Sequence, residues 1–340
     1  MEQERRSIRI GLTAIALAAV LRIFSSGILQ DAAVFFSDPK VISFLLYLET
    51  GRVMRIPEAT EATIEQTEAP QTLPVPEAIP ENHLPVAFFP ADAAQIGIRN
   101  NAGYSVDLEN LLLQPLEWDL KQAAPAVLLV HTHATESYTQ TPDATYTPSS
   151  QYRTLDPAHN MLAVGAHLAQ LLQQRGIQTV HDTTLHDYPS YTGSYSNSRK
   201  TIRGYLEDCP QIPLILDIHR DAVETEAGKQ LAQTITVDGK KIAKLMLVVG
   251  TDAGGLKHPH WEQNLSLAVK LHAQLESICP GICRSISFRQ ERFNQDLTAG
   301  TLLVEVGAAG NTLPEALAAV EVLADAIEAL AYGTTAGSTR

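Results

Sequence analysis

From Pro125 onward the chain alternates between apolar runs and amphipathic segments, and this alternation constrains the fold more than any other feature. The run 126–133 is apolar and ends in polar residues, as a buried parallel strand does. Residues 157–175 carry apolar side chains at helical spacing up to a stop at Gly176. Further strands are expected at 177–182, 212–222, 231–238, 241–252 and 301–312, and further helices at 197–206, 261–278 and 314–331. Strands that alternate with helices predict an α/β domain whose mainly parallel central sheet has helices on both faces.

Three of the expected strands end in ionisable side chains. They contribute His131, His133 and Glu136, then Asp217, His219, Arg220 and Asp221, and finally Glu305. Because the carboxyl ends of parallel strands meet along one crevice, these side chains should lie close together. Imidazole and carboxylate groups suit Zn²⁺, and three protein ligands leave a fourth position for water. HTHATE is not a local metal motif, so the residues alone leave two interpretations: a zinc site, or histidines that make ordinary hydrogen bonds.

The composition excludes several classes of protein. The formal net charge is -13, from 25 Lys and Arg against 38 Asp and Glu, and no long basic run occurs, so no nucleic acid is expected as a partner. The three cysteines, Cys209, Cys279 and Cys283, are too few for a disulfide-stapled scaffold or a zinc site of four cysteines. Cys279 and Cys283 either form a disulfide or, with Cys209, stay buried thiols. Any metal must be held by some of the 11 histidines and by carboxylates.

The N-terminal segment has the pattern of an export signal. Arg5, Arg6 and Arg9 precede an apolar run over 10–21, and apolar character resumes after Arg22. A cleaved signal peptide needs an apolar core of about 7–15 residues, whereas a membrane span needs about 20. No small-residue cleavage site follows the run, so we expect an uncleaved signal anchor with its basic end in the cytoplasm. An amphipathic helix of a soluble protein is the alternative.

A change in composition separates this segment from the rest of the chain. Residues 51–85 contain six prolines and six glutamates but no lysine or aromatic residue, so they cannot form a packed core. We expect an extended tether with a reach on the order of 100 Å. The predicted organisation is a cytoplasmic stub, anchor and juxtamembrane segment at 1–49, a linker at 50–85, a partly helical lead-in at 86–124, a catalytic domain at 125–332 and a tail at 333–340.

Seven motifs occur in a fixed order: HTHATESY, NMLAVGAHLAQLLQQRGI, LDIHRDA, KLMLVVGTD, PHWEQNLSLAVKLH, RFNQDL and LLVEVGAAGNTLPEA. In this order, over 126–331, they resemble the stage II sporulation protein P family. The resemblance implies a membrane-anchored peptidoglycan hydrolase whose catalytic domain is similar to zinc-dependent cell-wall amidases. It further implies N-acetylmuramoyl-L-alanine amidase and crosslink endopeptidase activity, used in septal wall thinning and engulfment with stage II sporulation proteins D and M.

The same resemblance assigns roles to single residues. His133 matches the zinc-binding histidine after the first strand of those amidases, and His219 matches the second imidazole ligand. Glu305, in the Glu-x-Gly pattern of the late strand, matches the catalytic glutamate. The amidases have a ligand glutamate at the start of the first helix, where this chain reads DPAHNMLAVG without one. Glu136 is therefore nominated as the third ligand of one Zn²⁺ per chain. The alternatives for this third position are His131, Asn160 or a water.

Further candidates are expected to position a ligand or to bind substrate. Arg220 either holds a substrate carboxylate or forms an ion pair with Asp221 or Asp217. His131 and Asp221 are candidates of the same kind. Asn294, Gln295 and Asp296 either line the substrate groove or cap a turn. His258 and His260 are expected to be an incidental surface pair.

The expected function is thus zinc-dependent hydrolysis of peptidoglycan on the outer face of the cytoplasmic membrane, in the septal or engulfing membrane. The expected partners are peptidoglycan, the two sporulation proteins and the membrane. The alternative is a metal-free wall-binding or scaffold subunit, which the missing amidase glutamate favours. His133, His219 and Glu305 argue against that alternative, because a pure binder does not need them. A soluble zinc peptidase is disfavoured by the anchor and tether.

Overall fold

The computed structural model describes residues 83–84, 86–116, 119–120, 123–332 and 334–335. All of them lie in the second of two compact units, Met1–Pro74 and Val75–Arg340. The expected anchor and nearly all of the expected tether lie outside the described residues, so both stay predictions. Among the described helices, none combines the length and the apolar character that crossing a membrane requires.

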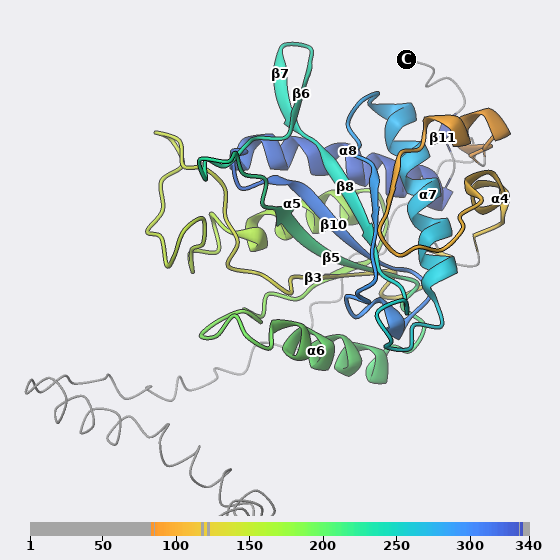
Figure 1. The fold of residues 1–340 in the computed structure, drawn as a ribbon, viewed down its shortest axis with the longest axis horizontal. Helices are drawn as coiled ribbons and strands as arrows, with labels where there is room; N and C mark the ends of the chain where they lie inside the picture. The colour runs from red at the N-terminus through yellow and green to blue at the C-terminus, as the bar shows by residue number, and fades with distance from the viewer. Residues whose placement is uncertain (1–82, 85, 117–118, 121–122, 333, 336–340) are drawn as a thin grey trace, which may run out of the picture. The chain divides into compact units, whose positions relative to one another are not determined.

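A seven-stranded sheet forms the centre of the described unit, in the order β2-β9-β8-β10-β5-β3-β4 (Figure 1). Its strands are β2 (Ile98–Asn100), β3 (Val127–Val130), β4 (Thr179–His181), β5 (Leu214–Asp221), β8 (Leu245–Val249), β9 (Ile286–Phe288) and β10 (Thr301–Ala308). Neighbouring strands are parallel except β10 and β8, which are antiparallel. The prediction of a mainly parallel sheet is confirmed, with one reversal of direction beside β10.

Helices cover both faces of this sheet, as predicted. They are α5 (Met161–Gln174), α6 (Ser194–Asp208), α7 (Trp261–Ile278) and α8 (Leu313–Tyr332). On one face, Leu129, Leu216 and Val304 of the strands join the core formed with α5, α7 and α8. On the other face, Leu128 and Ile215 pack in a smaller core against α6, which lies apart from the other helices in Figure 1. The two cores use alternate residues of the same strands, because successive side chains point to opposite faces.

The ends of α5 have identifiable causes. The side chain of Asn160 accepts a hydrogen bond from the backbone N–H of Leu162, which caps the first turn. At the other end Gly176 has a φ of 75°, in the left-handed region that glycine adopts without strain. Both ends fall within a few residues of the sequence prediction, and the predicted bounds of α7 match the structure.

The remaining described elements are short. They are β1 (His83–Leu84), η1 (Pro90–Gln95), α4 (Leu108–Leu113), β6 (Thr234–Val237), β7 (Lys240–Ala243), η2 (Gln295–Leu297) and β11 (Thr334–Thr335). The predicted turn at Asp238 and Gly239 joins β6 to β7, and both residues have positive φ, as such a hairpin turn requires. The lead-in contributes more than helix, since its strand β2 pairs with β9 at the edge of the sheet.

Replacing Gly165 with alanine should destabilise the fold. A Cβ at this position of α5 would lie 2.4 Å from His131 Nε2 and 2.5 Å from His181 Nε2. Overpacking of this kind costs about 1–3 kcal/mol. Gly204→Ala in α6 is the matched control, because nothing lies within 4 Å of its Cβ and alanine favours a helix by up to about 1 kcal/mol. Urea denaturation of both variants checks this, and equal stability gains would contradict the packing argument.

Candidate functional site

Glu305 and His219 lie directly opposite one another in the parallel strands β10 and β5. Paired residues of neighbouring strands project from the same face of a sheet, so both side chains enter the same crevice. His219 is 3% exposed. Oε2 of Glu305 is buried and has no hydrogen-bond partner in the described part of the chain. A buried carboxylate oxygen without a protein partner is suited to a ligand that the chain itself does not supply.

A bulge fixes the end of β10 immediately after Glu305. The register with β5 shifts between Glu305 and Ala308, and Gly307 has a φ of 66°. Oδ1 of Asn311 accepts hydrogen bonds from the backbone N–H groups of Ala308 and Gln233, at 2.9 Å each. A Cβ on residue 307 would lie 2.7 Å from that Oδ1 atom. The bulge therefore requires glycine, both for the positive φ and for the lack of space beside Asn311.

His133 reaches the crevice from the turn that follows β3. Its ring centroid lies 5.2 Å from that of His219, in an edge-to-face arrangement. Tyr191 stacks on the imidazole at 4.5 Å, and Tyr195 meets its edge at 5.6 Å. Nδ1 of His133 is buried without a hydrogen-bond partner among the described residues. The predicted pair of histidines is therefore brought together.

His219 lies between two carboxylates. Its Nε2 atom is 2.9 Å from Oδ1 of Asp217, within ion-pair distance although not aligned as a hydrogen bond, and its Nδ1 atom is 3.7 Å from Oε2 of Glu136. Asp217 is held in turn by Thr132, whose backbone N–H donates to Oδ1 at 2.8 Å and whose hydroxyl donates to Oδ2 at 2.6 Å. Asp217 thus orients the imidazole, a role that the sequence reasoning did not give it.

Glu136 lies in the crevice as predicted, but two guanidinium groups already hold it. Its Oε1 atom is 3.3 Å from Arg153 Nη2 and 3.6 Å from Arg220 Nη1, and its Oε2 atom accepts from the backbone N–H of Arg220 at 3.3 Å. Arg220 also donates to the carbonyls of Ser137 and Tyr152. The expected ion pair of Arg220 with Asp221 or Asp217 is wrong, since its carboxylate partner is Glu136.

Burial and mutual charge shift the pKa values in this cluster. Burial raises the pKa of Glu305 to about 8, although the charge of His219 opposes the shift. Burial alone would lower the pKa of His219, but Asp217 and the other carboxylates raise it to about 9. Burial would raise the pKa of Asp217, and His219 and Thr132 lower it to about 2. Burial, aided by His219, lowers the pKa of His133 to about 4. One imidazole is therefore neutral near pH 7 and the other is charged.

The metal-free protein should lose stability as the pH rises. His219 and Glu305 have folded-state pKa values of about 9 and about 8, above the ordinary values of 6.5 and 4.5. Their contribution is fully present below those ordinary values and is lost as the pH rises through 8 and 9. Each proton changes the unfolding free energy by at most about 1.4 kcal/mol per pH unit. Urea denaturation with a chelator present tests this, and Glu305→Gln should flatten the slope; a rise in stability over this range would contradict it.

His131 points away from this cluster. Its Nδ1 atom lies 3.0 Å from the carbonyl of Ile218, and its Nε2 atom lies 2.8 Å from Nε2 of His181. Burial, with a smaller contribution from His181, lowers the pKa of His131 to about 3. Asn160 is occupied as the cap of α5 and donates to the carbonyl of Thr154. Both residues therefore have structural partners in the protein.

The segment 294–296 also makes structural contacts. Asn294 donates to the carbonyl of Tyr195 and to the hydroxyl of Ser198, both in α6. Gln295 is fully buried and hydrogen bonds to backbone atoms at the end of β8, and Asp296 forms a bidentate ion pair with Arg199. The hydroxyl of Ser198 lies 2.7 Å from that of Thr132 and donates to it, because the Thr132 proton is given to Asp217, so Asn294 connects indirectly to the residue that holds Asp217. The Asn294 side chain makes no capping hydrogen bond to η2, so the expected turn cap is not what these contacts form, and a place in the substrate groove stays a prediction.

The structure differs from the sequence expectations at four residues outside the cluster. Asp221 pairs with Arg284 at 2.6 Å rather than with Arg220. His258 is 1% exposed, so it is not part of a surface pair. All three cysteines are thiols, but only Cys279 is buried, whereas Cys209 and Cys283 are partly exposed.

Four residues around the histidines were missed by the sequence reasoning. They are Arg153, Asp187, Tyr191 and Tyr195. Arg153 pairs with Asp187 and lies over the ring of Tyr191 at 4.9 Å, so together they enclose His133 and Glu136. All but Tyr195 come from segments that have neither helical nor alternating periodicity, and therefore no pattern marks them.

The donor atoms of the predicted ligands suit a zinc ion, but their present arrangement is not yet that of a metal-binding site. The 3.7 Å between His219 Nδ1 and Glu136 Oε2 is close to the separation of about 3.4 Å expected for two ligands of one tetrahedral zinc ion. Nδ1 of His133 is the unpartnered third donor. No three His, Cys, Asp or Glu side chains of the described residues already form a metal-binding group. Binding would require Glu136 to give up part of its pairing with arginine.

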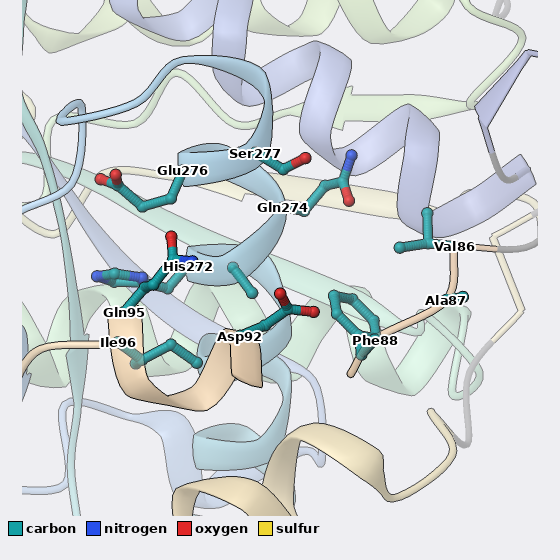
Figure 2. A pocket seen from close by; sticks show the side chains of 11 residues that line it. Val86, Ala87, Phe88, Asp92, Gln95, Ile96, His272, Gln274, Glu276 and Ser277 are labelled. Atoms are coloured by element: carbon teal, nitrogen blue, oxygen red, sulfur yellow. The ribbon is translucent and has the colours of Figure 1, made fainter. Parts of the chain in front are cut away.

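A separate pocket of about 370 Å³ lies between the segment 86–96 and α7 (Figure 2). Figure 2 shows His272, Gln274 and Glu276 of α7 across from Phe88, Asp92 and Gln95. None of the residues predicted for the site lines this pocket, so it is distinct from the crevice.

The fold and the crevice define an α/β protein with buried imidazole and carboxylate side chains at the ends of neighbouring parallel strands. The chain belongs to the family of stage II sporulation protein P (SpoIIP), whose model matches residues 57–328. This confirms the family resemblance of the sequence motifs.

One relative is the stage II sporulation protein P of Bacillus subtilis (strain 168), which is 30% identical over 210 residues, or 58% of this chain. The match covers 49% of that protein, so this chain spans about half of its length. Among solved structures, N-acetylmuramoyl-L-alanine amidase AmiC2 of Nostoc punctiforme shares 15% identity at a TM-score of 0.35, covering 62% of this chain and 96% of that one. The CwlD amidase of Clostridioides difficile, in complex with the GerS lipoprotein, shares 12% identity with this chain at a TM-score of 0.36. That match covers 61% of this chain and 95% of the amidase.

Proposed function

We propose that this chain is a zinc-dependent peptidoglycan hydrolase of sporulation. It cleaves the N-acetylmuramoyl-L-alanine amide and peptide crosslinks during septal wall thinning and engulfment. The observation that carries the proposal is the pairing of Glu305 with His219 on neighbouring strands, with a buried carboxylate oxygen that has no partner in the described residues. Membership of the sporulation protein family supports the biological setting.

His133, His219 and Glu136 would hold the zinc ion. When bound, zinc lowers the pKa of a water towards about 7 and polarises the scissile carbonyl. The carboxylate of Asp217 would keep His219 oriented through its Nε2 atom, in the way that carboxylates commonly support a metal-bound imidazole. Tyr191 and Tyr195 would exclude bulk water from the ring of His133.

Glu305 would move the proton. A carboxylate beside the crevice can take a proton from the attacking water and give it to the leaving amine, which is the same step for an amide of the glycan–peptide junction and for a crosslink. A general acid–base group works best when its pKa lies near the operating pH, and in the metal-free protein burial raises the pKa of Glu305 to about 8. Because both amide bonds need the same proton transfer, a single active site with Glu305 would serve both cleavages.

The proposed setting is the outer face of the cytoplasmic membrane. The basic and apolar pattern of residues 1–29 supports an anchor, and the proline- and glutamate-rich segment supports a tether to the catalytic domain. Stage II sporulation proteins D and M are the proposed partners at the septal or engulfing membrane.

Zinc analysis of the purified full chain, combined with mass spectrometry of peptidoglycan digested by it, tests the proposal. We expect about one zinc per chain, released stem peptides and a lower fraction of crosslinked peptides. Intact peptidoglycan after incubation with zinc-loaded protein would overturn the amidase proposal.

The pairing of Glu136 with Arg153 and Arg220 favours one alternative, a metal-free wall-binding or scaffold subunit. In such a subunit the carboxylate would serve only to hold the loops around the crevice. Peptidoglycan sedimentation separates the two proposals, because a scaffold would sediment with the wall equally well with zinc or with a chelator and would release no products.

A further inference from the structure

An open groove of about 870 Å³ lies beside the crevice. It is lined by residues that include Arg99, Met246 and Ser287. Met246 of β8 is the antiparallel partner of Glu305, whereas Arg99 of β2 pairs with Ser287 of β9. Ser287 also pairs with Val248, two residues from Met246, so the groove lies on the face of the sheet that carries Glu305.

The charge of this groove is opposite to that of the chain. Its lining contains four cationic side chains and two carboxylates, although the chain as a whole has a net charge of -13. The cations are Arg99, Lys244, Arg284 and Arg289, and the carboxylates are Asp221 and Glu224. Because the surrounding chain is acidic, such a concentration of positive charge selects for a short anionic ligand and against a long polyanion.

Two of the four cations have no partner among the described residues. Arg284 pairs with Asp221 at 2.6 Å, and Arg289 pairs with Glu291 at 3.3 Å. The side chains of Arg99 and Lys244 make no hydrogen bond or ion pair within the part of the chain that the structure describes. They are therefore the groups that an incoming carboxylate would engage.

We propose that this groove binds the carboxylate-bearing stem peptide, with Arg99 and Lys244 as its main contacts and the scissile end directed at Glu305. The inference rests on the proposed function and adds to it the residues that select the substrate. Asp221 lies at the end of β5, the strand that pairs with β10, and belongs to the lining, so the groove continues from the crevice towards the β2 edge. A peptide bound there would leave its amide end beside the proposed proton carrier.

Calorimetric binding of a free stem peptide to the full chain tests the proposal without requiring hydrolysis. Arg99→Gln/Lys244→Gln should weaken binding at least about tenfold, which corresponds to about 1.4 kcal/mol. The matched control is Lys200→Gln/Arg203→Gln, which removes one lysine and one arginine from exposed positions of α6 and should change binding less than about twofold. The same peptide with amidated carboxyl groups should bind weakly to all three proteins.

Several results would overturn the proposal. Wild-type affinity in the Arg99→Gln/Lys244→Gln variant would show that the groove does not hold the peptide, provided circular dichroism confirms its fold. Loss of affinity for a teichoic acid polymer, with peptide affinity unchanged, would assign the groove to a phosphate polymer instead. Peptide binding that depends on these cations, in a chain that cleaves no peptidoglycan, would support the groove and reject the proposed function.

Discussion

A Glu305→Gln chain should hydrolyse peptidoglycan at least about a hundredfold more slowly than the wild-type chain, because an amide cannot carry the proton that the carboxylate would transfer. Glutamine has nearly the same volume, so the packing of β10 should be retained. Zinc content should also be unchanged, since Glu305 is not among the three proposed ligands. Product release from purified peptidoglycan, measured by mass spectrometry at equal protein concentration, gives the rate.

The matched control for this variant is Glu207→Gln, an exposed glutamate of α6, which should retain wild-type activity. The pH profile adds a second readout, because the limb that Glu305 contributes should disappear in the variant. Turnover by Glu305→Gln within a few-fold of wild type would reject the assigned role.

His133→Ala and His219→Ala should each weaken zinc binding at least about tenfold. Either substitution removes one of three proposed donors, and loss of a group that merely supports a ligand already costs about 10–100-fold. Competition with a chromophoric chelator measures the affinity directly, without relying on activity. His167→Ala is the control, since that imidazole is partly exposed on α5 and lies 3.7 Å from Glu321, away from the crevice.

A full complement of tightly bound zinc in either variant would remove that histidine from the ligand set. Asp217→Asn gives an intermediate case, because it leaves all three donors in place and replaces the carboxylate that lies beside Nε2 of His219 and accepts hydrogen bonds from Thr132. Its affinity should fall between those of the wild type and His219→Ala.

The longer strands that are buried on both faces could be predicted, whereas β9, whose three residues are all buried, was missed because it is too short to show a pattern. The longer strands, β3, β5 and β10 among them, read as continuous apolar runs followed by polar residues, and each was located to within a few residues. The edge strand β2 was missed because its three residues are partly or fully exposed and show no alternation. The reversal at β8 was also beyond prediction, because an apolar run carries no sign of its direction.

The candidate site was predictable where its residues follow predicted parallel strands. Topology places the ends of parallel strands together, which was enough to join His219 with Glu305 across 86 residues. The hydrogen-bond network around them was not predictable, because Arg153 comes from a segment without periodicity. The contacts of Gln295 depend on the path of the chain after β9, which the sequence pattern did not indicate.

The register of β10 with β5 determines which face of the sheet receives Glu305, and the bulge held by Asn311 follows directly after that register. Side chains along a strand alternate with a period of two, so a slip of one residue would move Glu305 into the apolar core and a valine into the crevice. The slipped strand would lose the hydrogen bond that the backbone N–H of Ala308 donates to Asn311, and it would place a carboxylate among the apolar side chains of the larger core. Asn311 lies outside β10, yet its hydrogen bond to Ala308 helps to hold the strand in the register that presents Glu305 to the crevice. Change at position 311 would therefore lower the fraction of correctly registered molecules before it altered the chemistry of those that remain.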